Sequence, residues 1–410
     1  MSNAIRGVVS LALAAVVSLM SPGTARSDVV TDWNLVIFQV GGGGGRLTRA
    51  MAMTHIAMFD AVNATGPRYQ AYLDGVPNGT GASPEAAAIG AAYGVLIRLY
   101  PTQVAALDAA KASSLAGIPD GPAKTLGLSI GDEVAAAIVE ARTDDHWLDP
   151  NPAYLFTPGP GVYEPTPPAF APPVNVGAAT WRPFALAGAA QFRPNGPAKL
   201  HTGEYARDLA ETRDLGSATS VTRTVEQSLI AQWHTETATP AFNRIARILA
   251  ADHHPDLLDN ARTFALINIA IADATISCFE AKYVFASWRP ITAIRRADTD
   301  GNARTVPDPD WTPFLATPPH PEYPAAHGVI SSAPAEIIEK AYGNRQGFTT
   351  TSAGVPGVSR TFESVRAFLD DATVARIYGG MHFRTALREG VWQGRKVGRW
   401  ILETTMRPLQ

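Results

Sequence analysis

The sequence predicts an all-α protein. In nearly every patterned segment the apolar residues recur at the 3.6-residue period of a helix, and few stretches alternate as strands do. Ala, Leu, Ile and Glu, which favour helices or tolerate them well, fill most of these segments. With 410 residues, of which 46% are hydrophobic and 17% charged, the chain can bury a large core, which excludes a disordered protein. We expect one large domain.

Helices are expected along most of the chain, and two of them carry start signals. Thr224 with Gln227 three residues later fits a capping box, and Thr239 followed by Pro240 fits a cap with proline at the first helical position. The periodicity predicts helices over Arg46–Ala64, Pro84–Leu99, Thr102–Leu115, Ala123–Arg142, Gly203–Leu215, Thr224–Trp233, Pro240–Ala251, Leu258–Trp288, His327–Ala341, Thr361–Arg376 and Thr385–Thr405.

Residues 149–197 interrupt the helical pattern. Closely spaced prolines and glycines forbid long helices there and predict an ordered, irregular excursion between an N-terminal helical part, residues 27–148, and a C-terminal one, residues 198–410. Because aromatic residues are interleaved with the prolines, we expect the excursion to pack on the body or to rim a site, so that the parts form one domain. These aromatic residues are Tyr154, Phe156, Tyr163, Phe170 and Trp181.

The N-terminus, residues 1–26, has the pattern of a secretory signal peptide. Arg6 precedes an apolar run from Gly7 to Met20, and small residues follow. The run is too short to span a bilayer comfortably, so we expect no membrane span and a secreted or periplasmic protein. The only cysteine, Cys278, excludes an intrachain disulfide and lies in an apolar run, where we expect it to be core.

The charge balance excludes broad classes of partner. Lys and Arg number 34 against 37 Asp and Glu, which gives a formal net charge of −3, and no basic run stands out. The chain therefore lacks the electrostatic pattern of a nucleic-acid-binding protein. Any anion that it binds must be held by a local cluster of side chains.

Two segments place cations and an imidazole at predicted helix ends. The helix over Leu258–Trp288 brings Lys282 close to Arg289, where Pro290 disfavours further helix. A proline-rich loop then leads to His327 at a predicted helix start, beside unpaired N–H groups that suit an oxyanion and proton transfer. The alternatives are two solvated cations and a helix-capping histidine.

A third segment runs from Arg376 through Gly379 and Gly380 to His382. The two glycines permit close backbone approach. Together the three segments offer three fixed positive charges and two imidazoles, the set needed to hold a tetrahedral or trigonal-bipyramidal oxyanion. We predict that five side chains converge on one pocket at helix ends: Lys282, Arg289, His327, Arg376 and His382.

These segments resemble the motifs of the vanadium-dependent haloperoxidases and the related type 2 phosphatidic acid phosphatases, which read K-x6-R-P, P-S-G-H and S-R-x5-H-x3-D. Here the motifs stand at Lys282–Pro290, Pro324–His327 and Ala375–Ala386. Other segments look like the bacterial haloperoxidase-like branch, so the resemblance covers most of the chain after residue 26. They are Asp32–Asn34, Met53–Asn63, Ala281–Tyr283, Trp288–Arg295, Pro307–Pro313 and His320–Pro324.

The resemblance implies a helical bundle of the haloperoxidase type, carrying the proline-rich excursion, and a vanadate cofactor whose place phosphate can take. His382 would coordinate vanadium, and His327 would act as the acid–base group. The implied ligands of the oxyanion oxygens are Lys282, Arg289, Arg376 and the backbone N–H of Ala326.

Two reactions share these residues. A haloperoxidase oxidises halide with hydrogen peroxide and passes the product to a small organic acceptor, whereas a phosphatase forms a phosphohistidine at His382 while His327 protonates the leaving alcohol. His320, seven residues before His327, stands where bromide-oxidising relatives are similar in carrying His, which favours bromide or iodide. Trp288 is expected in the surroundings of the halide.

Three positions depart from the family pattern. Ala325 replaces Ser, which removes a hydroxyl donor worth about 1 to 3 kcal/mol. Ala326 replaces Gly but keeps its N–H. Ala386 replaces the Asp that orients the nucleophilic histidine of the phosphatases, which counts against a phosphatase, whereas coordination by His382 survives if another acceptor orients the ring.

The sequence therefore supports three hypotheses from different classes, in this order. The first is a vanadate-dependent haloperoxidase, the second is a metal-free phosphomonoesterase, and the third is an oxyanion-binding protein that has lost turnover through Ala325 and Ala386. The retained His327 counts against the third, because a mere binder has little need of an acid–base group. An oligomer is possible under all three.

Overall fold

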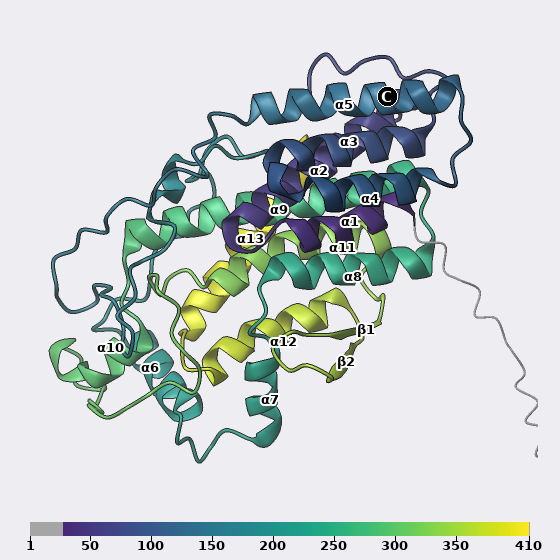
Figure 1. The fold of residues 1–410 in the computed structure, drawn as a ribbon. Helices are drawn as coiled ribbons and strands as arrows, with labels where there is room; N and C mark the ends of the chain where they lie inside the picture. Colours follow the sequence, from purple (N-terminus) through teal and green to yellow (C-terminus); the bar gives the residue numbers. More distant parts are fainter. Residues whose placement is uncertain (1–27, 410) are drawn as a thin grey trace, which may run out of the picture.

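The computed structural model describes residues 28–409, and the predicted signal peptide over residues 1–26 lies outside them. The regular secondary structure of the described chain is almost all helix, so the predicted all-α class is confirmed (Figure 1). The helices are α1 Val29–Val40, α2 Gly44–Thr65, α3 Pro84–Leu99, α4 Val104–Leu115, α5 Pro122–Ala141, α6 Gly203–Gly216, α7 Val225–Trp233, α8 Ala238–His253, α9 Leu257–Phe285, α10 Pro290–Arg295, α11 Ala326–Tyr342, α12 Val365–Tyr378 and α13 Arg384–Thr404. Two strands, β1 Phe348–Thr351 and β2 Ser359–Phe362, pair antiparallel.

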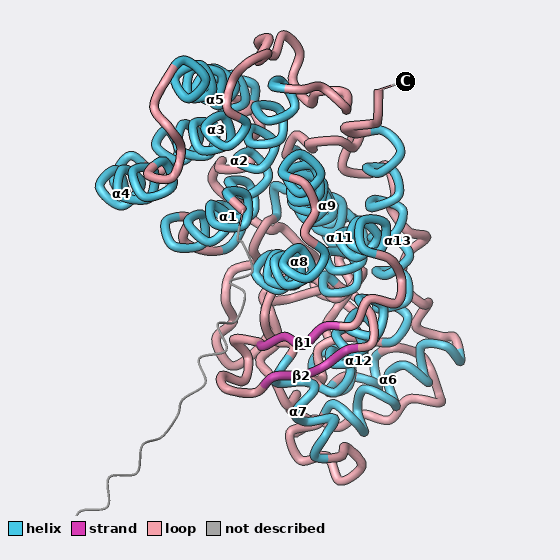
Figure 2. The backbone as a smooth tube through the Cα atoms, turned by 90° about the vertical axis from the view of Figure 1, so that its right-hand side faces the viewer, coloured by secondary structure: helices cyan, strands magenta, loops and turns pink. Residues whose placement is uncertain are grey.

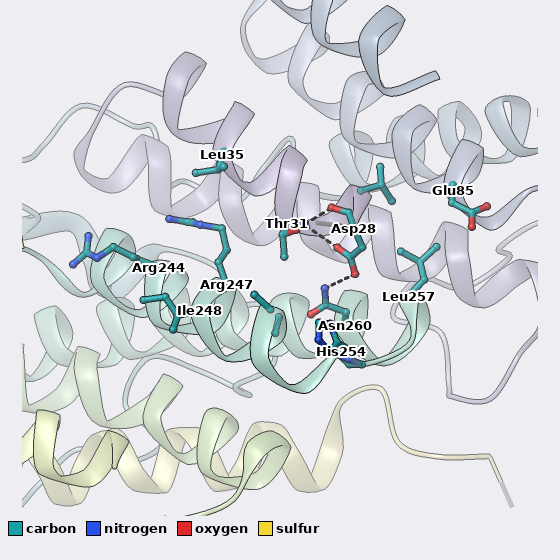
Figure 3. Close-up of a pocket in the computed structure, with 14 residues that line it drawn as sticks. Asp28, Thr31, Leu35, Glu85, Arg244, Arg247, Ile248, His254, Leu257 and Asn260 are labelled. Carbon is teal, nitrogen blue, oxygen red and sulfur yellow. Dashed lines mark hydrogen bonds between the residues drawn. The ribbon is translucent and has the colours of Figure 1, made fainter. Parts of the chain in front are cut away.

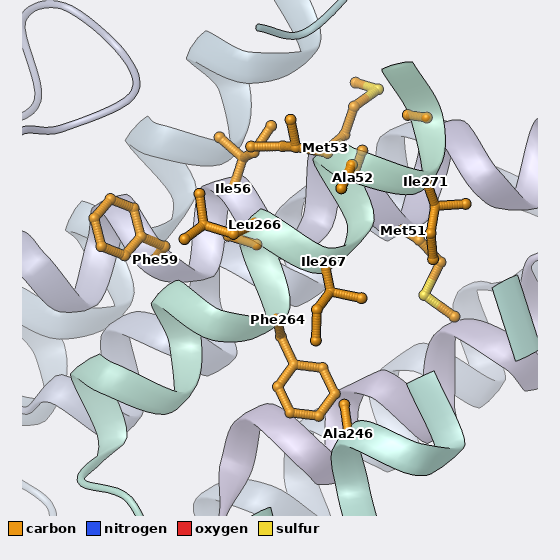
Figure 4. Packing of buried hydrophobic residues seen from close by; sticks show 14 of the residues in the cluster. Met51, Ala52, Met53, Ile56, Phe59, Ala246, Phe264, Leu266, Ile267 and Ile271 are labelled. Carbon is orange, nitrogen blue, oxygen red and sulfur yellow. The ribbon is translucent and has the colours of Figure 1, made fainter. Parts of the chain in front are cut away.

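The core is built around α9. This helix is long and apolar enough to cross a membrane, but 94% of its most apolar stretch is buried inside the fold, as is typical of a core helix. In Figure 4, Phe264, Ile267 and Ile271 of α9 lie among buried side chains that include Met51 of α2 and Ala246 of α8. Cys278 is fully buried here, as predicted.

Helices α9 and α11 lie between two groups of helices. Figures 1 and 2 show α2 to α5 on one side of them and α6, α7 and α12 on the other, with the two-strand ribbon beside α12. The C-terminal end of α9 and the N-terminal end of α11 lie toward this second group, to which α12 itself belongs. The segments that carry the predicted site residues therefore meet there (Figure 1).

Helices α11 and α13 pack closely, and this packing holds in place the loops that precede them. A Cβ atom on Gly394 of α13 would lie 2.1 Å from the Val329 carbonyl oxygen of α11, so only glycine allows this approach. At the N-terminal ends of the two helices, the Ala325 N–H donates to the Ala386 carbonyl at 3.0 Å. The loop before α11 and the loop before α13 are thereby held side by side.

The proline-rich excursion packs on the body. The buried carboxylate of Asp273 in α9 accepts the N–H groups of Phe184, Ala185 and Leu186 at 2.6 to 2.9 Å. Val162 forms a bridge with Ser287 just after α9. The excursion therefore reaches the turn that carries Lys282 toward Arg289.

Several predicted boundaries were wrong, each for a local reason. Helix α12 begins at Val365, because the β-branched residues around Thr361 pair in the ribbon instead. Helix α9 ends at Phe285, where Ala286 adopts a left-handed conformation with φ 44°. Helix α8 begins at Ala238 after Thr237, so Pro240 is its third residue, where the missing N–H still costs no helical bond.

Two helices were missed and one start signal is confirmed. The short helix α10 was not predicted. Helix α1 was not predicted either, although the Asp28 side chain caps it by accepting from the N–H groups of Val30 and Thr31. The capping box of Thr224 and Gln227 is present at the start of α7.

Candidate oxyanion site at the helix ends

The predicted site residues lie at the ends of four helices and in the loops between them. Lys282 is in the last turn of α9, Arg289 caps the start of α10, and Arg376 is in the last turn of α12. His327 is the second residue of α11, and His382 precedes α13 by two residues. Because helix ends leave backbone groups unpaired, this meeting place is rich in hydrogen-bonding groups.

The three cations are buried and, among the described residues, none of them forms an ion pair. Lys282 and Arg289 are 0% exposed and Arg376 is 3% exposed. Their donors reach backbone carbonyls, imidazoles and a sulfur, and within residues 28–409 no carboxylate forms an ion pair with any of them. Burial lowers the pKa of Lys282 to about 7, of Arg289 to about 10 and of Arg376 to about 9. An anion in this place would relieve the cost of burying the cations.

Arg289 holds the cluster together. Its Nε donates to the His320 carbonyl at 2.7 Å, and one terminal nitrogen donates to the Met381 carbonyl at 2.8 Å. The same nitrogen lies 3.2 Å from Nε2 of His382. Because a guanidinium can only donate, this contact makes Nε2 the acceptor and places the ring proton of His382 on Nδ1.

Glu322 orients His382. Its Oε1 accepts from Nδ1–H of His382 at 3.0 Å and from the Phe383 N–H at 2.9 Å. Burial raises the pKa of Glu322 to about 7, and burial together with Arg289 lowers the pKa of His382 well below 6.5, so the imidazole is neutral. The Nε2 lone pair thereby faces Arg289, and this neutral tautomer is the one that metal coordination or nucleophilic attack requires.

Glu322 was not predicted as a site residue. The sequence predicted only that another acceptor would have to orient His382 in place of the acid missing at Ala386. The sequence did contain a signal, because Glu322 is the only acidic residue between His320 and His327 and directly follows a proline. The partner, His382, is 60 residues away, and only the fold shows the pairing.

His327 and Arg376 carry polar atoms that no group of the described chain satisfies. Nε2 of His327 and Nε of Arg376 are buried and have no hydrogen-bond partner. Arg376 donates to the His234 carbonyl at 2.9 Å, and its other terminal nitrogen contacts Sδ of Met381. Burial and the nearby Arg376 charge lower the pKa of His327 well below 6.5. Both orphaned atoms belong to residues predicted to contact the oxyanion.

The helix that carries His327 has an open N-terminus. Its N-cap is Ala325, which offers no capping side chain, and its first residue is Ala326. Helical conformation keeps the Ala326 N–H available, as expected when Gly is replaced. The uncapped amides, the unpaired cations and the orphaned nitrogens together fit a tetrahedral oxyanion such as vanadate or phosphate.

Two further predicted residues lie nearby, on different sides. The His320 ring stands edge-on to Phe279 with 5.1 Å between centroids, and its Nδ1 is 2.9 Å from Arg289. Trp288 is 1% exposed and lines a separate cavity of about 300 Å³ that also touches Glu322 and Ala386. Trp288 and Glu322 line the same cavity, and the expected role of Trp288 near the halide stays a prediction.

A larger cavity lies away from these residues. It has a volume of about 880 Å³ and is lined by Arg247 of α8, Asp28 before α1, and Asn260 of α9 (Figure 3). The Asp28 carboxylate there is already engaged by the first turn of α1 and by the Asn260 side chain. None of the predicted site residues lines this cavity.

Comparisons with known proteins concern the family and the fold. Residues 262–410 match the family described as the VCPO second helical-bundle domain. The fold superposes on the crystal structure of the first bacterial vanadium-dependent iodoperoxidase with a TM-score of 0.78 and 26% identity, covering 93% of this chain and 96% of that one. The C-terminal part of the chain thus matches a vanadium haloperoxidase family, and the described chain has the vanadium haloperoxidase fold.

Two other vanadium haloperoxidases are more distantly similar. Vanadium chloroperoxidase from Curvularia inaequalis is 24% identical over 199 residues, and the match spans 35% of this chain and about a third, 32%, of the relative's length. The apo-type structure of a bacterial vanadium-dependent chloroperoxidase superposes with a TM-score of 0.67 at 17% identity, covering 87% of this chain and 92% of that one. This last likeness concerns the fold alone.

Proposed function

We propose that this protein is a vanadate-dependent haloperoxidase that oxidises a halide with hydrogen peroxide. The observation that carries the proposal is the buried trio of Lys282, Arg289 and Arg376, which has no ion-pair partner within residues 28–409 and adjoins a neutral histidine held by Glu322. Burying three cations costs free energy unless an anion neutralises them. Vanadate, unlike a bound phosphate, would also form a coordination bond with Nε2 of His382.

Each side chain has a distinct part in this proposal. Bound vanadate would supply a Lewis-acidic centre that activates hydrogen peroxide toward a halide. Lys282, Arg289 and Arg376 would neutralise the oxyanion oxygens, and their burial strengthens these contacts by excluding water. Glu322 keeps the proton of His382 on Nδ1. The unpartnered Nε2 of His327 would give or take a proton at an oxyanion oxygen.

The halide is proposed to be bromide or iodide. His320 lies at the cluster through Arg289, and the structural relative at 26% identity is an iodoperoxidase. The product would react with a small organic acceptor. We further propose, from the pattern of residues 1–26, that the protein works outside the cytoplasm, in the periplasm or secreted.

A phosphatase is the second candidate, and one observation favours it. The missing acid at Ala386 counted against a phosphatase because the nucleophilic histidine would lack orientation. Glu322 supplies that orientation from another loop, so this objection no longer holds. A phosphoenzyme at Nε2 of His382 would use the same cations, with His327 as the acid. An oxyanion binder without turnover is the third candidate.

The test is performed on the mature protein with and without added orthovanadate. We expect vanadate-dependent bromination of phenol red by bromide and peroxide, and no hydrolysis of p-nitrophenyl phosphate. His382→Ala should abolish both vanadate binding and bromination, while His253→Ala, at the exposed end of α8, should retain them. Full activity in His382→Ala would refute the site. Hydrolysis inhibited by vanadate would establish the phosphatase instead.

A further inference from the structure

Among the methionines of the described chain, Met381 is the one that contacts the cation cluster. A terminal nitrogen of Arg376 contacts its Sδ, and Arg289 donates to its backbone carbonyl at 2.8 Å. The next residue in the chain is His382. A soft, oxidisable thioether therefore forms part of the wall around the proposed oxyanion position.

The other described methionines share the burial of Met381 and differ in position. Met51, Met53 and Met58 of α2 are 0% exposed, and Met381 and Met406 are 2% exposed. An oxidant arriving from bulk solvent would find all of them protected. An oxidant formed at the oxyanion site would meet only Met381, because the others lie in the core cluster or near the C-terminus.

We propose that Met381 is a self-oxidation site, converted to the sulfoxide by the two-electron oxidant that the proposed haloperoxidase reaction makes beside it. The sulfur lone pair attacks the halogen of the hypohalous acid, and the halogen–oxygen bond breaks with release of hydroxide. Water then displaces halide from sulfur and loses two protons, one of which neutralises the hydroxide, so the products are sulfoxide, halide and one proton. Sulfur loses two electrons and the halogen gains two. Without halide, hydrogen peroxide can do the same when its O–O bond breaks and the second oxygen leaves as water.

The consequence for the site follows from the contact with Arg376. A sulfoxide oxygen is a stronger hydrogen-bond acceptor than a thioether sulfur and carries greater bulk. It would hold the Arg376 guanidinium away from the oxyanion, so oxyanion affinity would fall with each turnover-linked oxidation. The enzyme would thus limit its own activity when it lacks an organic acceptor.

The test is peptide mass spectrometry after turnover. Trypsin releases residues 377–384 with Met381 alone, and residues 50–68 with Met51, Met53 and Met58 as an internal control. After vanadate, peroxide and bromide without acceptor, we expect a gain of about 16 Da on residues 377–384, at least about tenfold more frequent than on residues 50–68. Omitting bromide separates oxidation by peroxide from oxidation by the hypohalous product.

Because this inference rests on the proposed function, activity is recorded in the same samples. Bromination with an unmodified 377–384 peptide would overturn the inference and leave the function standing. Equal oxidation of both peptides, or oxidation without vanadate, would also overturn it. Absence of both bromination and modification would refute the function and the inference together.

A pair of variants separates oxidation of Met381 from general damage. Met381→Leu conserves volume and cannot form a sulfoxide, so its bromination rate should decay more slowly relative to its own initial rate. Met406→Leu, at a position equally buried, should decay like the unmodified protein. Vanadate affinity measured after turnover should fall in the unmodified protein and stay constant in Met381→Leu. Identical decay and identical affinity in all three proteins would refute the proposal.

Discussion

Two buried cation clusters in this fold handle their charge in different ways. In the N-terminal part, Arg49 and Arg142 both pair with the Asp145 carboxylate, at 2.7 and 3.1 Å, and all three are less than one-tenth exposed. In the C-terminal part, Lys282, Arg289 and Arg376 are buried at least as deeply, and within residues 28–409 no carboxylate pairs with them.

The difference teaches how a binding site can be told from a structural ion pair. Asp145 lets two arginines connect α2, α5 and the excursion, because Arg142 also donates to the Pro183 carbonyl at 2.9 Å. In the second cluster the buried carboxylate, Glu322, is turned to His382 instead of to the cations. The second cluster therefore has positive charge without an ion pair in the described chain, which the proposed oxyanion would neutralise.

The largest expected effect is a loss of stability in the cluster of Arg49, Arg142 and Asp145. Asp145→Asn should lower the free energy of unfolding by about 3 to 5 kcal/mol, because two buried guanidinium groups lose their counter-charge. Urea unfolding in an oxyanion-free buffer measures it. Arg376→Met is the matched control in the other cluster, since it removes a buried charge that has no carboxylate partner within the described chain.

In Arg376→Met the unfolding free energy should stay unchanged or rise, while stabilisation by added vanadate or phosphate should be lost. Equal destabilisation by both substitutions would erase the distinction between the clusters. It would mean that the C-terminal cations are satisfied by the fold itself.

The second prediction sharpens the role of Glu322. Glu322→Gln should weaken vanadate binding by about 10- to 100-fold, because the amide no longer fixes the ring proton of His382 by its charge. Ala386→Asp, which restores the acid of the family pattern beside the same small cavity, should recover part of this loss. Vanadate titration of the single and double variants measures both effects. Full affinity in Glu322→Gln would show that the ring is oriented by other contacts.

The third prediction concerns pH. Burial lowers the pKa of Lys282 from its ordinary 10.5 to about 7, so the unfolded chain binds more protons than the folded one between these values. Relative to Lys282→Met, the free energy of unfolding should therefore rise by about 1.4 kcal/mol per pH unit above about pH 7. Saturating oxyanion should flatten this rise, because the bound anion keeps Lys282 protonated. A flat difference in oxyanion-free buffer would contradict the lowered pKa.

The parts that the sequence could predict are those with local signals. The 3.6-residue period gave the helices, and lysine, arginine and histidine at fixed spacings near helix ends marked the cluster, because each motif lies within a few residues. Glu322 needed a partner 60 residues away, and the β1 and β2 pairing is set by contacts across a loop. Such features depend on where loops pass in space, which periodicity does not describe.

The smallest expected effect tests the departure at Ala325, the N-cap of α11, which is 0% exposed. In Ala325→Ser the new hydroxyl can cap α11 when no anion is bound, which should raise the unfolding free energy by about 0.5 to 1 kcal/mol. With an anion bound, the hydroxyl can donate to it instead, and vanadate affinity should rise about 2- to 10-fold. Ala333→Ser, at a fully buried position farther along α11, should leave the affinity unchanged. If Ala325→Ser raised stability alone, the open helix end would be a capping defect; a gain in affinity identifies it as part of the oxyanion site.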